Sequence, residues 1–542
     1  MIVLSGSSPA LAAETVLSTG TADASGSQGA KWRRVDFVVP QTAPSTLTLS
    51  WTGTADMRFA VFESSTNTKI GANLTAANPK SVTLNLQAGI AYHSGIWAYS
   101  GVGNYVFTLG QPGPEPPPPG GRPNIILINT DDQRADTIQY LPKLRRWLVD
   151  GGTNFTNGYV STPSCCPSRA TLMSGRYVHN NGQYNQQTLG FNLNLTTQRY
   201  LHDAGYLTGH AGKFLHWLGL SEEAPHFDRW TYFKGGYNDV YMNFDGTIRR
   251  SQGYSTIITF DRAIAYINDF EARNDSKPFY LSLAPIAPHS PSIAEARYAT
   301  APVPAYRPDP SYQEADRSDK PQWVRNRNVD PATAEALRTS MIRTLYTLDD
   351  QIDRLMQHLQ VTGELGNTMV ILTSDNGYMW GEHKLSSKFM PYRPAVEVPF
   401  LIRWPGHVPA GATDSRFVTH VDIAPTILAA AGVTQNYMPF DGRNIFSGDS
   451  RTQAFTEYYH DLGNSRYIPS WASIRTSGYQ YVEYYDITNP RLVVFREYYD
   501  MQADPYQLVN LYADGNPAND PAVAPLSTQL QAARQCSGTS CP

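Results

Sequence analysis

The chain has 542 residues. At roughly 150 residues per domain this predicts two to four domains and excludes a single small module. Lysine and arginine total 43 and aspartate and glutamate 47, so the net charge is −4, and no long basic run is present. This balance excludes recognition of nucleic acid through bulk charge. Hydrophobic residues form 41% of the chain, enough for a globular core, but no stretch of about 18 apolar residues predicts a membrane span.

The N-terminal part combines a leader-like segment with β-strand patterns. The opening segment of residues 1–29 contains Ala10-Leu11-Ala12-Ala13, which resembles the cleavage site of a truncated export signal. The alternative is a disordered Ser/Ala tail. Residues 30–110 carry short β-branched and aromatic runs between turn residues, which predicts a small β-sandwich. We assign it no activity, although aromatics such as Trp97 would suit carbohydrate binding. Residues 111–123 include four consecutive prolines and predict an extended linker.

After the linker, strands alternate with helices, which predicts an α/β domain over residues 124–440. Apolar runs of strand length occupy residues 124–129, 278–283 and 368–373. Apolar residues at helical spacing run from Phe260 to Phe270 and from Leu337 to Leu359. Residues 441–535 contain short Tyr-rich runs, which predict a small antiparallel sheet, and residues 536–542 form a tail. No internal repeat is evident.

The four cysteines form two pairs with different surroundings. Cys536 and Cys541 close the chain and are either a small disulfide, formed in an oxidising compartment, or two free thiols. Cys165 and Cys166 are adjacent and directly precede Pro167, which suits the first turn of a helix. Cys165 would then lie where free N–H groups and the helix dipole favour anions. The alternatives are a buried thiol pair or a vicinal redox pair.

Acidic and amide side chains follow two of the predicted buried strands. Asp131-Asp132 comes after the first strand of the α/β domain, and Asp375-Asn376 after the strand at 368–373. Open α/β sheets bind ligands beyond the carboxyl ends of their strands, so the four oxygen donors can meet. Such donors suit Ca²⁺ or Mg²⁺ better than zinc. Taken singly, each pair is equally explained as a helix cap or a turn.

The segment around Cys165 is specific. Cys165-Cys166-Pro167-Ser168-Arg169 resembles the signature of type I sulfatases, in which the first cysteine is converted to Cα-formylglycine. Residues 205–214 resemble the second sulfatase signature. Further similarity covers residues 124–132, 287–291, 374–383 and 499–505, so the resemblance spans roughly 123–512. The Cys-Cys-Pro-Ser-Arg form and Lys213-Phe214-Leu215-His216 are most similar to the branch that contains N-acetylglucosamine-6-sulfatases and heparan 6-O-endosulfatases.

The resemblance implies an alkaline-phosphatase-like fold with a mixed sheet and a complete set of site residues. By this resemblance, residue 165 becomes a hydrated aldehyde whose hydroxyl attacks sulfur, and Arg169 holds it. Its second hydroxyl then lets the aldehyde reform and expel sulfate. Lys213 and Lys388 contact the sulfate oxygens, and His289, assisted by Lys388, protonates the leaving alcohol. The implied metal ligands are residues 131, 132, 165, 375 and 376, and maturation requires formylglycine-generating machinery.

The chain departs from the family pattern at a few positions. Many sulfatases carry a histidine two residues after the signature lysine, but here Leu215 occupies that place and His216 follows it. We include His216 as the candidate that assists aldehyde regeneration. His179, His383 and His420 lie near matched segments, but capping or packing explains each of them better.

These observations predict a metal-dependent sulfuric ester hydrolase that is secreted, either extracellular or periplasmic, and acts on carbohydrate or aryl sulfates. One alternative is a phosphonate or phosphate monoester hydrolase that uses the same residues. Another is a carbohydrate-binding protein whose sulfatase-like domain is inactive because residue 165 remains a thiol. The loops at 217–241 and 298–327 are expected to line the substrate pocket.

Overall fold

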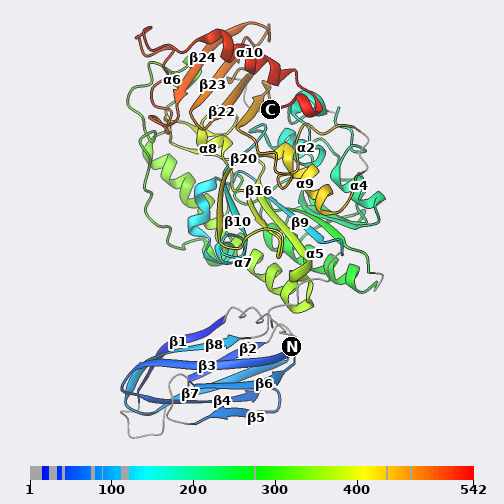
Figure 1. Ribbon diagram of the computed structural model, residues 1–542, viewed down its shortest axis with the longest axis vertical. Helices are drawn as coiled ribbons and strands as arrows, with labels where there is room; N and C mark the ends of the chain where they lie inside the picture. Colours follow the sequence, from blue (N-terminus) through cyan, green and yellow to red (C-terminus); the bar gives the residue numbers. More distant parts are fainter. Residues whose placement is uncertain are drawn as a thin grey trace, which may run out of the picture. The chain divides into compact units, whose positions relative to one another are not determined.

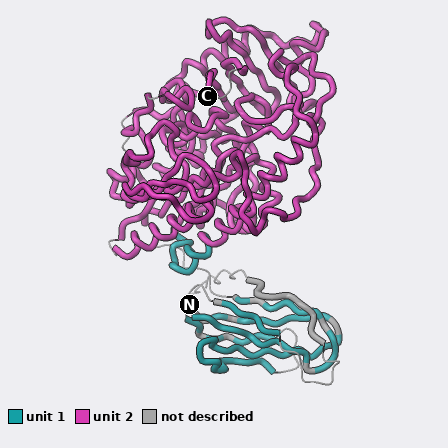
Figure 2. Tube along the Cα trace, turned by 180° about the vertical axis from the view of Figure 1, so that it is seen from behind, with its two compact units in different colours: residues 1–119, 356–367 teal, residues 120–355, 368–542 magenta. Residues whose placement is uncertain are grey.

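The computed structural model describes residues 15–23, 33–38, 43–74, 80–87, 90–110, 121–188, 190–273, 276–434, 438–463 and 467–542. The chain divides into two compact units (Figure 2): one is Met1–Pro119 with Met356–Asn367, and the other is Gly120–Leu355 with Thr368–Pro542. The leader-like residues 1–14 and residues 111–120 of the expected linker lie outside the described residues.

The first unit contains two four-stranded antiparallel sheets, with strand orders β1-β8-β3-β6 and β2-β7-β4-β5. Their strands are β1 (Thr15–Asp23), β2 (Arg33–Val38), β3 (Ala43–Gly53), β4 (Asp56–Glu63), β5 (Thr68–Asn73), β6 (Lys80–Leu86), β7 (Ala91–Ser100) and β8 (Val102–Gly110). Alternate residues of both sheets, such as Leu47, Phe59 and Phe107, share one buried cluster, as in a β-sandwich. One expectation is corrected: residues 15–23 are not tail, because β1 pairs with β8.

A ten-stranded mixed sheet organises the second unit (Figure 1), with the order β14-β13-β12-β11-β15-β9-β16-β19-β10-β20. Its strands are β9 (Asn124–Thr130), β10 (Thr153–Tyr159), β11 (Leu207–Lys213), β12 (Arg229–Phe233), β13 (Tyr241–Phe244), β14 (Thr247–Arg250), β15 (Phe279–Ala284), β16 (Thr368–Ser374), β19 (Leu401–Arg403) and β20 (Ala412–Thr419). β9 is buried along its whole length and pairs in parallel with β15 and β16. Continuous apolar runs are typical of strands covered on both faces.

Several helices cover this sheet, whereas α10 (Val523–Arg534) contacts strand β22 (Trp471–Thr476) of a smaller sheet. The helices of the described chain are α1 (Pro142–Leu144), α2 (Cys165–Ser174), α3 (Val178–Asn181), α4 (Thr197–Asp203), α5 (Ser255–Glu271), α6 (Gln322–Arg325), α7 (Pro331–Thr362), α8 (Arg393–Val396), α9 (Ile423–Ala430) and α10. Short 3₁₀ or π segments are η1 (Ala135–Tyr140), η2 (Arg145–Val149), η3 (Ala296–Tyr298), η4 (Glu364–Asn367), η5 (His420–Asp422) and η6 (Gly538–Ser540). Residues of α2, α4 and α9 share a buried cluster with Ile125 and Leu127 of β9, whereas α5 packs on β11 and β15.

A smaller antiparallel sheet follows near the C-terminus, with the order β21-β22-β23-β24. Its strands are β21 (Gln453–Tyr458), β22 (Trp471–Thr476), β23 (Tyr479–Tyr485) and β24 (Val493–Asp500), and a two-stranded ribbon pairs β17 (Met379–Trp380) with β18 (Ser386–Ser387). Cys536 and Cys541 form a disulfide. The expected α/β class, with a mixed sheet and a small separate sheet, is therefore confirmed. Within the described part of the chain, no helix has the length and apolar character that crossing a membrane requires.

Candidate active site

Two adjacent strand ends supply the acidic centre of the site. β9 and β16 pair in register up to Thr130 and Ser374, so the residues that follow them emerge side by side. Asp131, Asp132, Asp375 and Asn376 are all buried. The backbone N–H of Asp375 donates to the carbonyl of Thr130 over 2.9 Å, and the backbone N–H of Asp132 donates to Asp375 Oδ1 over 3.2 Å. The two expected pairs of oxygen donors are thus held against each other.

Helix α2 brings Cys165 to this centre. Its Sγ lies 3.4 Å from Asp131 Oδ1, at the first residue of the helix. Gln186 holds this turn, because its Oε1 accepts from the backbone N–H of Cys166 over 3.2 Å and its Nε2 donates to Ser164 Oγ over 2.8 Å. Burial, with Asp131 close by, raises the pKa of the Cys165 thiol well above its ordinary value. The unmodified side chain is therefore a protonated thiol at neutral pH.

Three buried cations face the three carboxylates. Arg169, one turn along α2, donates to Asp375 Oδ2 over 3.0 Å and to the carbonyl of Lys213 over 2.8 Å. Lys213 ends β11 and places its Nζ 2.5 Å from Asp131 Oδ2. Lys388 follows β18 and places its Nζ 2.5 Å from Asp132 Oδ1 and 2.6 Å from Cys165 Sγ. The formal charges, three negative and three positive, sum to zero, which makes burial of all six groups tolerable.

The ionisation of the carboxylates follows from these contacts. Burial opposes ionisation of Asp131, but the charges of Lys213 and His289 outweigh it and hold the pKa of this carboxyl well below its usual range. Burial and the neighbouring charge of Asp131 raise the pKa of Asp375. Burial also opposes the charge on Lys388, yet the carboxylate of Asp132 raises the pKa of its ammonium well above the usual value.

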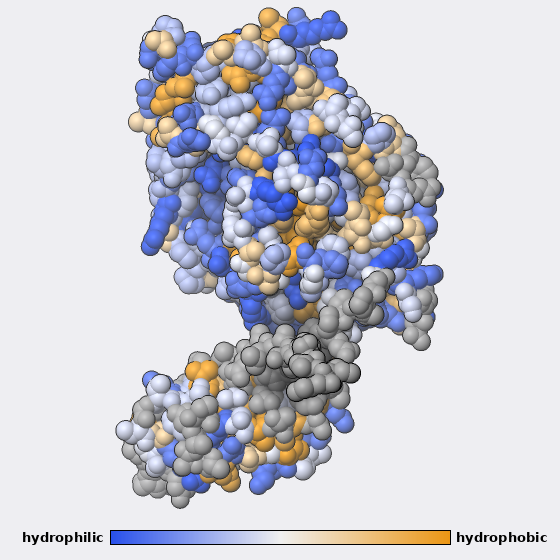
Figure 3. Space-filling view, in the orientation of Figure 1, coloured by the Kyte–Doolittle hydropathy of each residue, from blue (hydrophilic) through white to orange (hydrophobic). Residues whose placement is uncertain are grey.

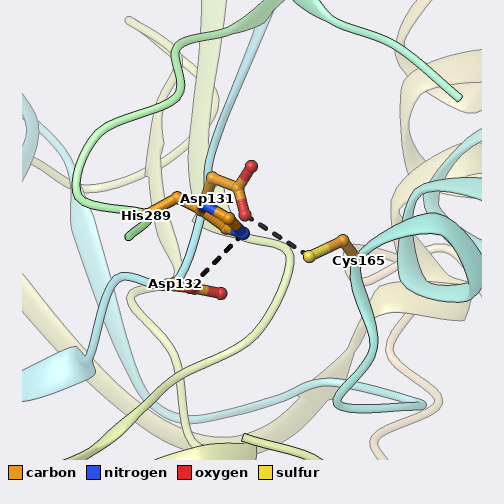
Figure 4. A group of neighbouring side chains, drawn as sticks. All are labelled: Asp131, Asp132, Cys165 and His289. Atoms are coloured by element: carbon orange, nitrogen blue, oxygen red, sulfur yellow. Dashed lines mark hydrogen bonds and ion pairs between the residues drawn. The ribbon is translucent and has the colours of Figure 1, made fainter. Parts of the chain in front are cut away.

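His289 lies at the open side of the centre, in the loop after β15, and its side chain is 30% exposed. Figure 4 shows the side chains of Asp131, Asp132, Cys165 and His289 converging from separate segments. His289 Nε2 lies 3.9 Å from Asp132 Oδ2. Its Nδ1 lies 2.6 Å from the carbonyl oxygen of Ser290, so Nδ1 carries a hydrogen and Nε2 is directed at the site.

The donor set fits a hard divalent cation. One ligand atom from each of Asp131, Asp132, Cys165 and His289 lies within 4.8 Å of the others. In addition, Asn376 Oδ1 is buried and accepts no hydrogen bond from the described residues, while its Nδ2 donates to Asp132 Oδ1 over 2.6 Å. A buried amide oxygen without a donor is costly unless it has a partner such as a cation. Carboxylate and amide oxygens are the ligands that Ca²⁺ and Mg²⁺ prefer.

The remaining histidines occupy different surroundings. The His216 residue as a whole is exposed. Part of its ring is nevertheless shielded from solvent, and this shielding, together with the charge of Lys213, lowers the pKa of the imidazole. His420 is buried between Ser168 Oγ and Thr373 Oγ1, and burial lowers its pKa to about 3. His383 Nδ1 lies 2.7 Å from Glu314 Oε2, and His179 Nδ1 lies 2.9 Å from Glu457 Oε1. These three histidines are engaged in buried contacts with other groups.

Sequence reasoning missed Gln186. This side chain connects residues 164 and 166 to a loop 20 positions further along the chain. That loop has no periodic sequence pattern. No local sequence motif marks a glutamine whose side chain accepts a hydrogen bond from a backbone N–H at a helix N-terminus. Contact across an irregular loop was therefore not predictable from spacing alone.

A helix N-terminus and buried lysines at the carboxyl end of a mixed α/β sheet are typical of a site that binds a small oxyanion. Comparison with known proteins defines the family. A model described as "Sulfatase" matches residues 123–433, and one described as "N-sulphoglucosamine sulphohydrolase, C-terminal" matches residues 381–536. The chain belongs to the sulfatase family, as its motifs predicted.

Named sulfatases of other organisms match the chain at moderate identity. The chain is 33% identical to "Extracellular sulfatase SULF-1 homolog" of Drosophila melanogaster, over 60% of this chain but 31% of that protein. It thus spans about a third of that relative's length. It is 28% identical to human N-acetylglucosamine-6-sulfatase, over 78% of this chain and 86% of that enzyme.

Solved structures show the same fold. The protein BT4656, solved in complex with its substrate D-glucosamine-2-N,6-O-disulfate, aligns with a TM-score of 0.63 at 25% identity, over 76% of this chain and 96% of that one. A phosphonate monoester hydrolase of Agrobacterium radiobacter aligns with a TM-score of 0.57 at 20% identity, over 76% and 96% of the two chains. The alkaline-phosphatase-like core is therefore shared by enzymes with different oxyanion substrates.

Proposed function

We propose that the protein is an extracellular hydrolase of carbohydrate sulfate esters. The observation that carries this proposal is the position of Cys165, at the first turn of α2 and beside Asp131 and Lys388. Conversion of this cysteine to formylglycine by maturation machinery would give a hydrated aldehyde, whose hydroxyl is the nucleophile that a buried, protonated thiol is not. A carbohydrate substrate is supported by the similarity to human N-acetylglucosamine-6-sulfatase and to BT4656, which was solved with a sulfated glucosamine.

A divalent cation, Ca²⁺ or Mg²⁺, would be held by Asp131, Asp132, residue 165, Asp375 and Asn376. When bound, it supplies positive charge beside the nucleophile and the sulfate oxygens. His289 lies close enough to this group to be a further ligand, but its Nε2 also faces the open side of the site.

Side chains of this protein would bind the sulfate oxygens, position residue 165 and protonate the leaving alcohol. Lys213, which contacts Asp131, and Lys388, which contacts Cys165, carry buried positive charge and suit binding of the sulfate oxygens. Arg169 fixes the orientation of Asp375 and would hold residue 165 in place. His289, with its Nδ1 hydrogen fixed by Ser290, would deliver a proton from Nε2 to the leaving alcohol. His216 lies in an exposed position near Lys213 and would assist regeneration of the aldehyde.

An extracellular location is supported by the disulfide between Cys536 and Cys541, because such bonds persist in oxidising compartments. The Drosophila relative is also named as extracellular.

The test combines mass spectrometry with kinetics. In native material, the peptide that contains residue 165 should be about 18 Da lighter than the unmodified peptide, and Cys165→Ala should lower kcat/KM for a sulfated glucosamine at least about 1,000-fold. Chelation should abolish activity and Ca²⁺ or Mg²⁺ should restore it. An unmodified thiol in active protein, or full turnover by the Cys165→Ala variant, would refute the proposal.

Rates on a sulfate, a phosphate and a phosphonate ester of one phenol separate sulfatase activity from the alternative that the shared fold allows. We expect the sulfate ester to be the best of the three. Saccharides sulfated at different positions, compared with an aryl sulfate, then define the substrate.

A further inference from the structure

Two adjoining cavities open beside Lys388. The first, of about 480 Å³, is lined by Lys388 and Phe389, and the second, of about 790 Å³, by Arg325 and Phe495. Trp323, Arg327 and Tyr467 line both, so the two cavities form one groove. In Figure 1 the helix α6 lies beside the small C-terminal sheet, and residues of both line the second cavity. The groove therefore leads from the proposed sulfate site toward that sheet.

The charged side chains that line this groove are all positive. Its charged lining residues are Arg325, Arg327 and Lys388, and no carboxylate lines either cavity among the described residues. This contrasts with the whole chain, whose net charge is −4. Lys388 is paired with Asp132, but Arg325 and Arg327 form no ion pair within the described residues. A groove whose unpaired charges are cations attracts anions.

Arg325 and Arg327 are exposed and available to a ligand. Neither guanidinium donates a hydrogen bond or forms an ion pair within the described ranges. The Arg327 guanidinium carbon lies 4.7 Å from the centre of the Tyr467 ring, within the range of a cation–π contact. Such a contact does not use the N–H groups as donors. A planar guanidinium with free edges is well suited to bidentate binding of a sulfate or carboxylate.

The size and aromatic walls of the groove indicate more than one sugar ring. Each cavity alone falls within the range of about 300–1,000 Å³ found for small-molecule sites. Trp323 is half-buried and packs against Tyr484 at a ring-centre distance of 6.2 Å, and Phe495 lies in the same wall. Aromatic faces beside polar groups suit the apolar faces and hydroxyl edges of sugars.

We propose that the groove binds a second anionic sugar residue of the substrate, with Arg327, supported by Arg325, pairing with a sulfate or carboxylate that is not cleaved. This rests on the proposed function and narrows it: the substrate class is a sulfated oligosaccharide with at least two anionic groups. An isolated monosulfated sugar or an aryl sulfate fills only the part of the site beside Lys388.

The test compares two substrates in the full chain: a multiply sulfated tetrasaccharide and 4-nitrophenyl sulfate. Arg327→Gln should lower the ratio of kcat/KM for the tetrasaccharide to kcat/KM for the aryl sulfate about tenfold, mainly through KM. The loss should shrink at high salt, because exposed charges are screened. Arg145→Gln is the matched control: Arg145 is also exposed, lies in η2 and lines neither cavity. It should leave the ratio unchanged.

Binding separates this inference from the proposed function. In the Cys165→Ala background, calorimetric titration with the tetrasaccharide should show about tenfold weaker binding when Arg327→Gln is added. An unchanged kinetic ratio and unchanged affinity in the Arg327→Gln variants would overturn the inference even if the wild-type protein is an active sulfatase. Absence of sulfatase turnover, with the tetrasaccharide still bound through Arg327, would instead refute only the proposed function.

Discussion

Lys388 contacts two groups that the proposed reaction needs together, the side chain of residue 165 and the carboxylate of Asp132. Its charge is retained in a buried position because the carboxylate of Asp132 outweighs the cost of burial. A cation fixed in this way can stabilise negative charge in a transition state without reorganising. Lys213 lies in the corresponding position beside Asp131.

We therefore expect Lys388→Ala to lower kcat/KM for an aryl sulfate about 100-fold or more. Lys69→Ala is the control, because Lys69 is an exposed lysine of strand β5 in the other unit. Steady-state kinetics and a thermal unfolding curve for each variant separate loss of catalysis from loss of structure. Equal rates for Lys388→Ala and the control, with both proteins folded, would exclude a catalytic role for Lys388.

At the scale of single elements, the close approach of β11 and β15 fixes Lys213. Gly212 precedes this lysine, has a φ of +122°, and pairs with Ala284. A Cβ atom at Gly212 would lie 2.1 Å from the carbonyl oxygen of Ala284, so a side chain would push the strands apart.

Gly212→Ala should therefore lower the free energy of unfolding by about 3 kcal/mol or more and reduce kcat/KM by displacing Lys213. Gly246→Ala is matched to it: Gly246 also has a positive φ, +92°, but a Cβ there meets nothing within 4 Å. It should cost about 1 kcal/mol. Urea unfolding of both variants measures the difference, and equal losses would show that strand spacing is not the cause.

A buried ion pair connects α3 with β21. His179 contacts Glu457 and also the carbonyl of Cys536, 3.0 Å from its Nε2. Burial opposes the charge on His179, but Glu457 outweighs it and raises the pKa of the imidazole above its ordinary value. The folded protein thus keeps this proton to a higher pH than the unfolded chain does. The resulting stabilisation is complete below the unfolded pKa and is lost as pH rises through the folded pKa.

His179→Gln should accordingly destabilise the protein more at pH 6 than at pH 9, by a difference of about 1 kcal/mol. Glu457→Gln removes the same ion pair from its acidic side and should flatten the same part of the profile. The free energy of unfolding, measured with urea at several pH values, tests this. Profiles of wild type and both variants that run parallel would contradict it.

The elements that the sequence predicted well are those with continuous apolar runs. The run at 124–129 corresponds to β9, that at 368–373 to β16, and the helical pattern between 337 and 359 lies within α7. Strand β11 has the sequence Leu-Thr-Gly-His-Ala-Gly-Lys, which lacks a strand pattern because its glycines serve close packing on β15. Strand β1 was missed because a Ser/Thr-rich edge strand resembles a tail.

Some site residues could be predicted from general rules of sheet geometry, and others only from the family motifs. The meeting of Asp131 with Asp375 follows from the rule for parallel strand ends. The inclusion of Lys388 and His289 required the family motifs, because both lie in irregular segments brought in by long-range contacts. The loop at 298–327 was expected to line the substrate pocket, and its residues 321–323 and 325–327 line the groove. The contact of Arg327 with Tyr467 joins segments 140 residues apart, which spacing could not predict.

For the molecule as a whole, the distribution of charge matters more than its sum. The chain carries a net charge of −4, and the face drawn in Figure 3 mixes hydrophilic and apolar residues without one broad apolar patch. Long-range attraction of a polyanion is therefore weak, and selection of a sulfated substrate depends on the local cations of the site and groove.

The β-sandwich should be separable from the rest of the chain, because it has its own buried cluster and contains none of the site residues. Among the residues whose burial is described, the buried cluster of the β-sandwich draws on residues between Val35 and Leu109. The proposed catalytic and metal-binding residues all lie in the second unit, between Asp131 and Lys388. The groove residues, which extend to Phe495, lie in the same unit.

We expect a chain of residues 120–542 to fold and to retain kcat/KM for an aryl sulfate within about threefold of the full protein. Its midpoint of thermal unfolding should match the catalytic unit's transition in the full chain. Loss of aryl sulfate turnover by a folded truncated protein would mean that the sandwich takes part in the site.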